Sequence, residues 1–348
     1  MSAQRSPAGE RTLMFEEAAD ASNAVRAQLE CEPAAMRALG AELRKLNPRA
    51  VITCARGSSD HAATYAKYLI ETHAQVLTAS AAPSVSSVYG VTQDVRGCLF
   101  IAISQSGRSP DLLASVASAK ASGATVLALC NSADSPLMAA ADLVIELNAG
   151  PEKSVAATKS YLASLAAIAR LVAAWKEDAQ LKAALAQLPD LMDRSWTLDW
   201  SAALPELESA ENLYVVGRGL GLSAAQEVAL KCKETCGIHA EAFSSAELRH
   251  GPFALLRKGF PALLLAQHDG TRPGIEALAV ELARRGVPVL LAGAHAAGSV
   301  SLPSVEVAAE LAPILLVQSA YRMIASLAVR RGLDPDRPPH LHKITETV

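Results

Sequence analysis

Short aliphatic runs alternate with longer amphipathic stretches along almost the whole chain. Apolar runs of this kind, bounded by turn-forming residues, are typical of strands buried on both faces, and the stretches between them are long enough for crossover helices. The pattern predicts an α/β protein whose parallel sheets are flanked by helices. We expect strands at Ala50–Cys54, Gln75–Thr78, Cys98–Ser104, Thr125–Cys130 and Leu143–Leu147, and again at Leu213–Gly217, Ile238–Ala242, Ala262–Gln267, Val287–Ala292 and Val305–Val307.

The two halves of the chain repeat each other. Ala55–Ser58 aligns with Gly217–Leu220, and Ile103–Gln105 aligns with Leu265–Gln267, at one shared offset of 162 residues. A shared offset across two strand-to-loop junctions indicates a duplicated unit. We therefore expect two tandem, doubly wound, flavodoxin-like domains, each with a five-stranded parallel sheet. The expected boundaries are a mobile tail at 1–11, a first domain at 12–195, a second domain at 196–332 and a C-terminal tail at 333–348.

Composition excludes several classes of protein. Lys and Arg number 32 and Asp and Glu number 35, so the net charge is −3 and we expect neither nucleic acid nor an anionic membrane as a partner. No run of about 18 uncharged apolar residues indicates a membrane span, and the polar N-terminus lacks a signal-peptide core, so we expect a cytoplasmic protein. The six cysteines form no Cys-x-x-Cys pair, and we expect them to be reduced core residues.

The most informative loop is Ser104–Ser109, which follows an expected strand and precedes a helix beginning at Pro110. Ser109 suits the N-cap position and Pro110 the first helical position. A helix N-terminus offers backbone N–H groups to an anion, and the neighbouring hydroxyls add donors. We expect a phosphate site here, with a plain polar turn as the alternative. The candidate phosphate-binding residues are Ser104, Gln105, Ser106 and Ser109, together with Gly57, Ser58 and Ser59 after the preceding strand.

The loop Gly217–Gly221 resembles a dinucleotide-binding fingerprint only in part. Leu222 stands where the third glycine of Gly-x-Gly-x-x-Gly belongs. This mismatch argues against a nicotinamide oxidoreductase.

Glu227, Lys231 and Glu234 lie at positions i, i+4 and i+7, on one face of an expected helix. Spacing alone favours a solvated face with a Glu-to-Lys pair. The alternative is a carboxylate general base beside an ammonium group, and the concentration of His and Glu that follows, up to His250, favours it. Glu247 and His250 lack further ligands at metal-binding spacing, so we expect no metal site.

These segments together resemble the isomerase half of the glutamine:fructose-6-phosphate amidotransferases, which consists of two sugar isomerase (SIS) domains. The resemblance rests on the loop Ser104–Gly107, the helix Glu227–Glu234, His239–Phe243, Glu247–Pro252 and the tail Leu341–Lys343.

The resemblance implies a hexose 6-phosphate substrate and assigns roles to individual residues. It makes Ser59, Ser104, Gln105, Ser106 and Ser109 the phosphate ligands, and the loop around Val155 would close over the sugar. Glu234 would move a proton between C1 and C2, with Lys231 and Glu227 as its neighbours. His250 would open the sugar ring from across a homodimer interface, and Lys343, next to His342, would contact the open-chain sugar.

The sequence also departs from that family. We see no glutaminase domain ahead of the first SIS domain, Ala157 replaces a serine near Val155, and Arg108 replaces an acidic residue. Glutamine-dependent synthesis is therefore disfavoured, and we expect deamination of glucosamine 6-phosphate to fructose 6-phosphate and ammonia, without metal or cofactor. A fructosamine-6-phosphate-type deglycase and an aldose-ketose phosphate isomerase are the alternatives. A non-catalytic sugar-phosphate sensor is disfavoured because Glu234, His250 and Lys343 are all present.

Overall fold

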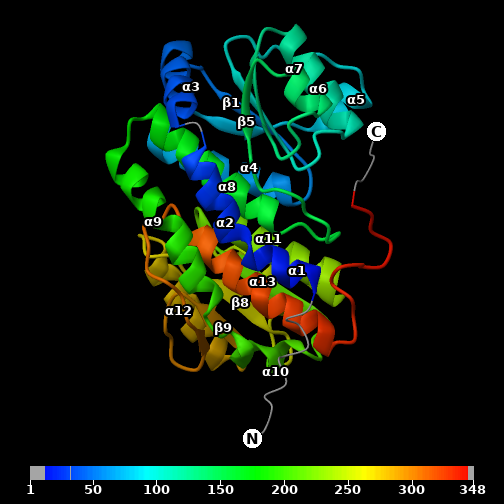
Figure 1. Ribbon diagram of the computed structural model, residues 1–348. Coiled ribbons are helices and arrows are strands. Elements are labelled where there is room, and N and C mark those ends of the chain that lie inside the picture. Colours follow the sequence, from blue (N-terminus) through cyan, green and yellow to red (C-terminus); the bar gives the residue numbers. More distant parts are fainter. Residues whose placement is uncertain (1–11, 32, 344–348) are drawn as a thin grey trace, which may run out of the picture. The chain divides into compact units, whose positions relative to one another are not determined.

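The computed structural model describes residues 12–31 and 33–343, and the chain forms two compact units (Figure 1). The β1–β5 unit contains Asn23–Pro151 and Ser160–Gln187. The β6–β10 unit contains the described residues up to Ser22, together with Glu152–Lys159 and Leu188–Lys343. The expected tail at 1–11 and the last residues of the C-terminal tail lie outside the described residues.

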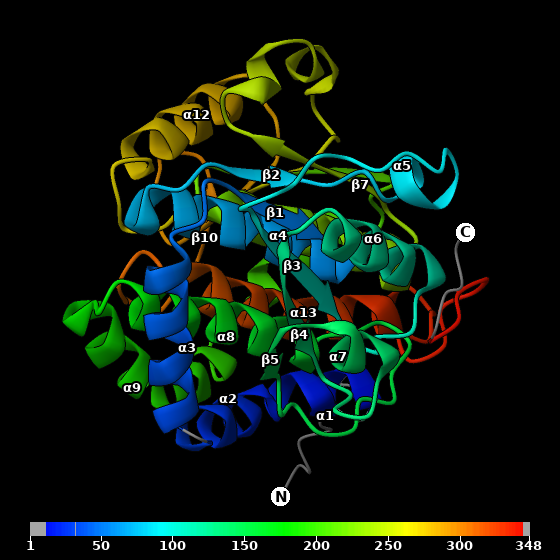
Figure 2. The ribbon, with the colours of Figure 1, turned by 90° about the horizontal axis from the view of Figure 1, so that it is seen from above.

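The β1–β5 unit has a parallel sheet in the order β2-β1-β3-β4-β5, which can be followed in Figure 2. Its strands are β1 (Val51–Cys54), β2 (Thr78–Ser80), β3 (Leu99–Ser104), β4 (Thr125–Cys130) and β5 (Leu143–Glu146). Its helices are α3 (Pro33–Leu46), α4 (Ser58–Leu69) with the π-helical turn η2 (Ile70–Ala74), α5 (Pro83–Ser87), α6 (Pro110–Ala121) and α7 (Pro136–Ala140). Three helices cross a unit boundary along the chain: α2 (Ala21–Glu30), α8 (Lys159–Trp175) and α9 (Ala179–Trp196).

The β6–β10 unit repeats this topology, because its parallel sheet runs β10-β9-β8-β6-β7. Its strands are β6 (Asn212–Gly217), β7 (His239–Ser244), β8 (Ala262–Leu265), β9 (Val289–Ala292) and β10 (Val300–Leu302). Its helices are α1 (Leu13–Ala19), α10 (Leu204–Leu207), α11 (Gly221–Cys236), α12 (Arg272–Arg284) and α13 (Ala312–Arg330), with short 3-10 turns η3 (Ser201–Ala203), η4 (Glu247–Arg249) and η5 (Pro252–Leu255). In sequence order both sheets read second, first, third, fourth, fifth strand, which confirms the predicted doubly wound pair.

Two strand predictions fail. Of the predicted segment Gln75–Thr78 only Thr78 belongs to β2, because the chain leaves η2 through Gln75 in the left-handed conformation, with a φ of 58°, which an extended strand does not contain. The fifth strand of the second copy is β10 (Val300–Leu302), and the predicted segment Val305–Val307 follows it as a loop. Pro303 has no backbone N–H to donate to a neighbouring strand, so pairing ends before it. The alternating Val-Glu-Val that follows looks like a strand but has no ladder to join.

Alternating side chains of the second sheet pack against helices on its two faces. Val216, Leu264 and Leu291 join the cluster that contains α12 residues such as Leu282. The intervening residues point the other way, because successive side chains of a strand face opposite sides. That side is covered by α11, which packs on β6, β7 and β8 and lies beside α13 (Figure 1).

Helix α13 is long and apolar enough to cross a membrane by length and composition alone. However, 83% of its most apolar 18-residue window is buried inside the protein. Helix α13 is therefore a helix of the protein core.

The cysteines behave as predicted with one exception. Five of the six are buried, whereas Cys31 is exposed at the end of α2. Burial raises the pKa of Cys54 and of Cys236 to about 11, and it raises the pKa of Cys232 well above its ordinary value. A thiol with a raised pKa holds little reactive thiolate near neutral pH.

We expect a thiol reagent at about pH 8 to modify one cysteine of the native chain quickly and the other five only after unfolding, because Cys31 is exposed and the other five are buried. Titration with a chromogenic disulfide measures this. The Cys31→Ser variant should lose the fast phase, and a second fast-reacting thiol in the native protein would contradict the assignment of the buried set.

Candidate functional site

The loop after β3 has the predicted geometry of an anion cradle. Ser109 takes the N-cap position of α6 and Pro110 the first helical position, and the Ser109 side chain makes no capping hydrogen bond. The Gly107 backbone N–H donates to Ser104 Oγ at 2.9 Å, which folds the loop back on itself. Gly107 has a φ of 65°, and a Cβ added there would lie 2.4 Å from Ser135 Oγ, so only glycine fits.

The cradle side chains are available to a ligand. Ser106 and Ser109 have no side-chain hydrogen bond to any residue that the structure describes, and the same holds for Gln105 and Ser59. Ser104 is the exception, since its hydroxyl is used inside the loop. Hydroxyl and amide groups beside a helix N-terminus suit the oxygens of a phosphate group.

An ion pair that the sequence analysis missed joins the two loops of this unit. Arg56, just after β1, donates through Nε and Nη2 to Asp111 Oδ2 in the first turn of α6, at 2.9 and 2.8 Å. Asp111 is buried, whereas the Arg56 side chain is 52% exposed. The pair therefore holds Gly57–Ser59 close to the Ser104–Ser109 loop and places a guanidinium group beside both. The sequence signal that could have predicted this ion pair is the arginine that recurs at the repeat offset, as Arg56 in the first copy and Arg218 in the second.

The predicted helix face on α11 is buried, which overturns the solvated reading that spacing alone favoured. Lys231 Nζ lies 2.6 Å from Glu234 Oε2 and 3.4 Å from Glu227 Oε1, and the Lys231 side chain is 1% exposed. Burial alone would lower the pKa of Lys231, but the carboxylates of Glu227 and Glu234 outweigh it and raise that pKa above the ordinary value. Lys231 therefore carries its charge at neutral pH.

Tyr321 on α13 completes this network. Its hydroxyl donates to Glu227 Oε1 at 2.7 Å, and both side chains are fully buried. A buried carboxylate needs such a donor as well as a cation. Tyr321 is 94 residues from Glu227 along the chain, and it sits in an apolar helix that carries no local sign of a polar partner.

Glu234 is the one member of the network that reaches solvent. Its side chain is 21% exposed, and only Oε2 is held by Lys231. Within the described residues, Oε1 has no hydrogen-bond partner. The arrangement fixes one carboxylate oxygen and presents the other, which is the geometry that a general base needs.

A third cluster ties the C-terminal tail to the loop around Val155. Lys343 Nζ donates to the Ser154 backbone oxygen at 2.6 Å and lies 3.4 Å from Glu152 Oε2. The Val155 backbone N–H donates to the Asp336 backbone oxygen at 3.2 Å. Two predicted site residues, Val155 and Lys343, thus belong to one assembly.

Glu17 holds the same loop from α1. Its carboxylate accepts the backbone N–H groups of Lys153 and Ser154. Burial raises the pKa of Glu17, although the backbone hydrogen bond from Lys153 opposes the rise. Neither Glu17 nor Glu152 was predicted, since nothing local in the sequence pairs α1 with a loop that far along the chain.

The two predicted histidines lie apart from these clusters. His250 is exposed in the turn between η4 and η5, and His342 is exposed next to Lys343. Among the described residues, neither imidazole has a hydrogen-bond partner. The predicted residues therefore fall into a hydroxyl-rich loop at the start of α6, a buried Glu-Lys-Glu network on α11 and a tail-to-loop cluster, and neither histidine side chain bonds to any of these groups within the described residues.

Comparison with known proteins identifies the family and agrees with the fold. A model of the SIS domain matches residues 46–174 and 206–329. The isomerizing glutamine–fructose-6-phosphate aminotransferase of Sulfurisphaera tokodaii is 32% identical over 303 residues, which make up 85% of this chain and 50% of that protein. The chain thus spans about half the length of the curated relatives that it matches.

Two solved structures are similar over nearly the whole chain. A candidate phosphosugar isomerase from Silicibacter pomeroyi DSS-3 is 38% identical, with a TM-score of 0.90 over 93% of this chain and 100% of that one. The C-terminal domain of glucosamine-fructose-6-phosphate aminotransferase from Francisella tularensis is 27% identical, with a TM-score of 0.85 over 96% of this chain and 100% of that one.

Lys231→Met tests the buried network, because it leaves the Glu227 carboxylate in the core without its cation. We expect the free energy of unfolding to fall by about 3–5 kcal/mol, measured by urea denaturation. The matched control Lys233→Met, exposed on the same helix, should change it by about 0.5 kcal/mol or less. Adding Glu227→Gln to Lys231→Met should recover part of the loss. Equal effects of the two lysine variants would refute the network's role.

Proposed function

The chain belongs to the SIS domain family, and we propose that it is an enzyme that deaminates glucosamine 6-phosphate to fructose 6-phosphate and ammonia. The observation that carries the proposal is Glu234, whose carboxylate has one oxygen held by buried Lys231 and the other open. The names of the relatives support an amino-sugar phosphate as substrate, since these names contain fructose 6-phosphate and, for the Francisella tularensis protein, glucosamine.

The cradle would bind the phosphate group of the substrate. Ser106, Ser109 and Gln105 would donate to its oxygens beside the N-terminus of α6, and the Arg56 guanidinium adds positive charge nearby. Phosphate binding is remote from C1 and C2, so its energy can be used to orient the reacting carbons.

Proton transfer would be the work of Glu234. In the open-chain aldose, Glu234 would remove the proton from C2 and return it to C1. One proton of the amino group would pass to O1, which completes the conversion of the 2-amino aldose into the 2-imine of fructose 6-phosphate. Water then adds to C2, and the carbinolamine loses ammonia to leave the ketone. Deamination needs only water as a second substrate. The half of the aminotransferases that this chain matches would therefore contain all the residues that the reaction needs.

The other members of the network would support this base. Lys231 keeps its charge and stabilises the Glu234 carboxylate, while Glu227 and Tyr321 hold Lys231 in place. Lys343 would reach the open-chain sugar after leaving Glu152 and Ser154, and Val155 and His342 would move with it.

We also infer a homodimer in which His250 opens the sugar ring in the partner's site. The support is the exposure of His250 and its lack of a partner among the described residues. A cytoplasmic location is part of the same proposal and is supported by the six free thiols.

A second candidate is an aldose-ketose phosphate isomerase, favoured by the similarity to the candidate phosphosugar isomerase from Silicibacter pomeroyi. The same base serves both reactions. The two are separated by incubating the protein with glucosamine 6-phosphate without glutamine and measuring ammonia and fructose 6-phosphate together. Equal amounts of both establish deamination. No ammonia, with interconversion of an aldose and a ketose 6-phosphate, would favour the isomerase, and binding without turnover of either substrate would favour a sensor.

Glu234→Gln should abolish turnover and leave substrate binding nearly unchanged, because the amide cannot accept the C2 proton but keeps the side chain's shape. General acid-base catalysis is worth about 10²–10⁴-fold, and a loss of at least that size is expected in kcat. Ammonia release measures turnover, and isothermal titration measures binding. Glu206→Gln, at an exposed site of the same unit, is the control. Undiminished kcat in Glu234→Gln would sink the assignment.

Mixing two inactive variants tests the dimer. If His250 acts in the partner's site, a heterodimer of Glu234→Gln and His250→Ala chains carries one intact site and one doubly damaged site. Random re-association should then restore about a quarter of the wild-type activity. Each variant alone, taken through the same dissociation step, is the control. A mixture no more active than its parts would show that both groups act within one chain.

A further inference from the structure

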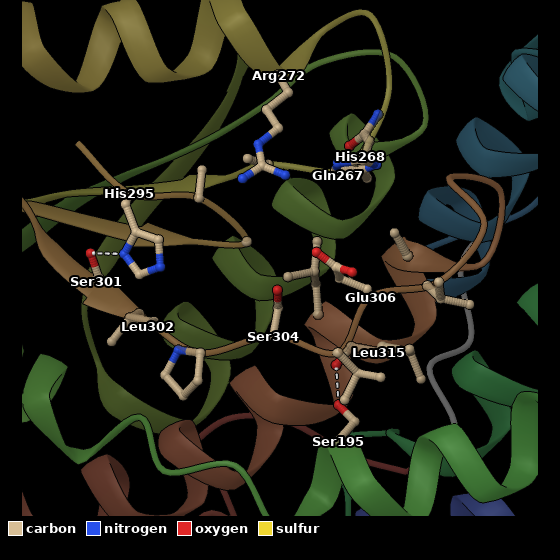
Figure 3. Close-up of a pocket in the computed structure, with 18 residues that line it drawn as sticks. Ser195, Gln267, His268, Arg272, His295, Ser301, Leu302, Ser304, Glu306 and Leu315 are labelled. Atoms are coloured by element: carbon tan, nitrogen blue, oxygen red, sulfur yellow. Dashed lines mark hydrogen bonds between the residues drawn. The ribbon is translucent and has the colours of Figure 1, made fainter.

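The β6–β10 unit contains a cavity of about 420 Å³ at the carboxyl ends of β8 and β9 (Figure 3). Its walls come from the segment after β8, the start of α12, the segment after β9 and the loop after β10, with α13 beneath. Pockets for small ligands have volumes of about 300–1,000 Å³, and ligands of open α/β sheets bind at this edge. The site belongs to the second copy of the repeat, away from the Ser104–Ser109 cradle in sequence.

The second copy cannot bind phosphate in the way that we propose for the first copy. At the repeat offset, Asp269 stands at the counterpart of Gly107, and its carboxylate accepts the N–H and the hydroxyl of Thr271 and the amide Nε2 of Gln267. A built-in carboxylate thus uses the donors at the N-terminus of α12. A ligand of this unit must therefore lie further out, toward β9 and the loop after β10.

Uncommitted polar groups line that outer space. Arg272 binds Glu276 through Nε alone, so its two Nη atoms have no hydrogen-bond partner among the described residues. Glu306 and Ser304 likewise have no side-chain hydrogen bond in the described part of the chain. Figure 3 shows Arg272, His295, Ser304 and Glu306 pointing toward the middle of the cavity from different sides.

The charges face each other without pairing. Arg272 and Glu306 form no ion pair within 4.0 Å, although both line the cavity. His295 adds an imidazole next to Ser301, whose Oγ lies 2.9 Å from its Nδ1. One side therefore suits an anion and the other suits a hydroxyl or ammonium donor.

We propose that this cavity is a second ligand site, for a small phosphorylated amino sugar or polyol. Its phosphate would bind Arg272 and His295, and its amino or hydroxyl groups would bind Glu306 and Ser304. The site adjoins the Glu227–Lys231–Glu234 network through two elements. Gln267 donates to the backbone oxygen of Arg218 in the loop that leads into α11, and Leu315 belongs to α13, which carries Tyr321. A bound ligand is thus placed to act on α11 and α13.

The test is isothermal titration of the full chain with glucosamine 6-phosphate, in a Glu234→Gln background that does not consume the probe. The choice of glucosamine 6-phosphate as the probe rests on the proposed function, whereas the inference of a ligand site in the cavity rests on the residues that line it. Ser106→Asp puts a carboxylate in the first cradle and should remove binding there, leaving the cavity event. Arg272→Ala should weaken the cavity event about tenfold or more, as should Glu306→Gln, which changes only an exposed side chain. Arg284→Ala, at the exposed far end of α12, should leave it unchanged.

The outcomes separate the two proposals. Binding that survives Ser106→Asp and falls with Arg272→Ala supports the cavity, even if no cradle event is seen and the proposed function fails. Loss of all binding in Ser106→Asp, or identical titrations of Arg272→Ala and Arg284→Ala, overturns the cavity site. Inorganic phosphate binding there as tightly as glucosamine 6-phosphate overturns the assignment of an amino or hydroxyl donor to Glu306.

Discussion

A lysine ammonium group with almost no access to water organises the β6–β10 unit. Lys231 must keep two carboxylates within reach, because an isolated charge in the core would be very costly. Glu227 in turn needs the Tyr321 hydroxyl, which fixes how α11 and α13 lie against each other. Glu234 is the second carboxylate that Lys231 needs, and it lies at the edge of the network, where its side chain is partly exposed to solvent. The position of this partly exposed carboxylate is thus set by the electrostatic needs of buried groups.

Residues at corresponding positions of the two copies make different interactions. Arg56 binds Asp111 and joins two loops of its unit, whereas Arg218 at the same repeat position donates to Ser244 Oγ. Gly107 has no side chain in its crowded loop, whereas Asp269 at the corresponding position carries a carboxylate that accepts from Thr271. The shared strand order preserves the carboxyl edge of each sheet, and the polar groups at that edge differ between the two copies.

Local patterns in the sequence predicted most strands and helices, but they could not predict side-chain pairs between residues far apart in the chain. Apolar runs and the repeat predicted both sheets, except for Val305–Val307, where an alternating run had no neighbour to pair with, and Gln75–Thr78, of which only Thr78 lies in β2. Helical spacing placed Glu227, Lys231 and Glu234 on one face, but spacing carries no information on burial. Tyr321 and Glu17 escaped prediction because their partners are 94 and 136 residues away, and only the fold brings them together.

The carboxylate of Asp269 also bears on how each half of the molecule responds to its surroundings. A cradle with uncommitted donors becomes more stable as its anion accumulates, by an amount that grows with the logarithm of concentration. A cradle that carries its own anion is insensitive to that supply, since its donors are already satisfied. On the proposed function, the first copy gains resistance to unfolding when phosphorylated ligands are abundant, whereas the Asp269 carboxylate stabilises its own loop whether or not a ligand is present.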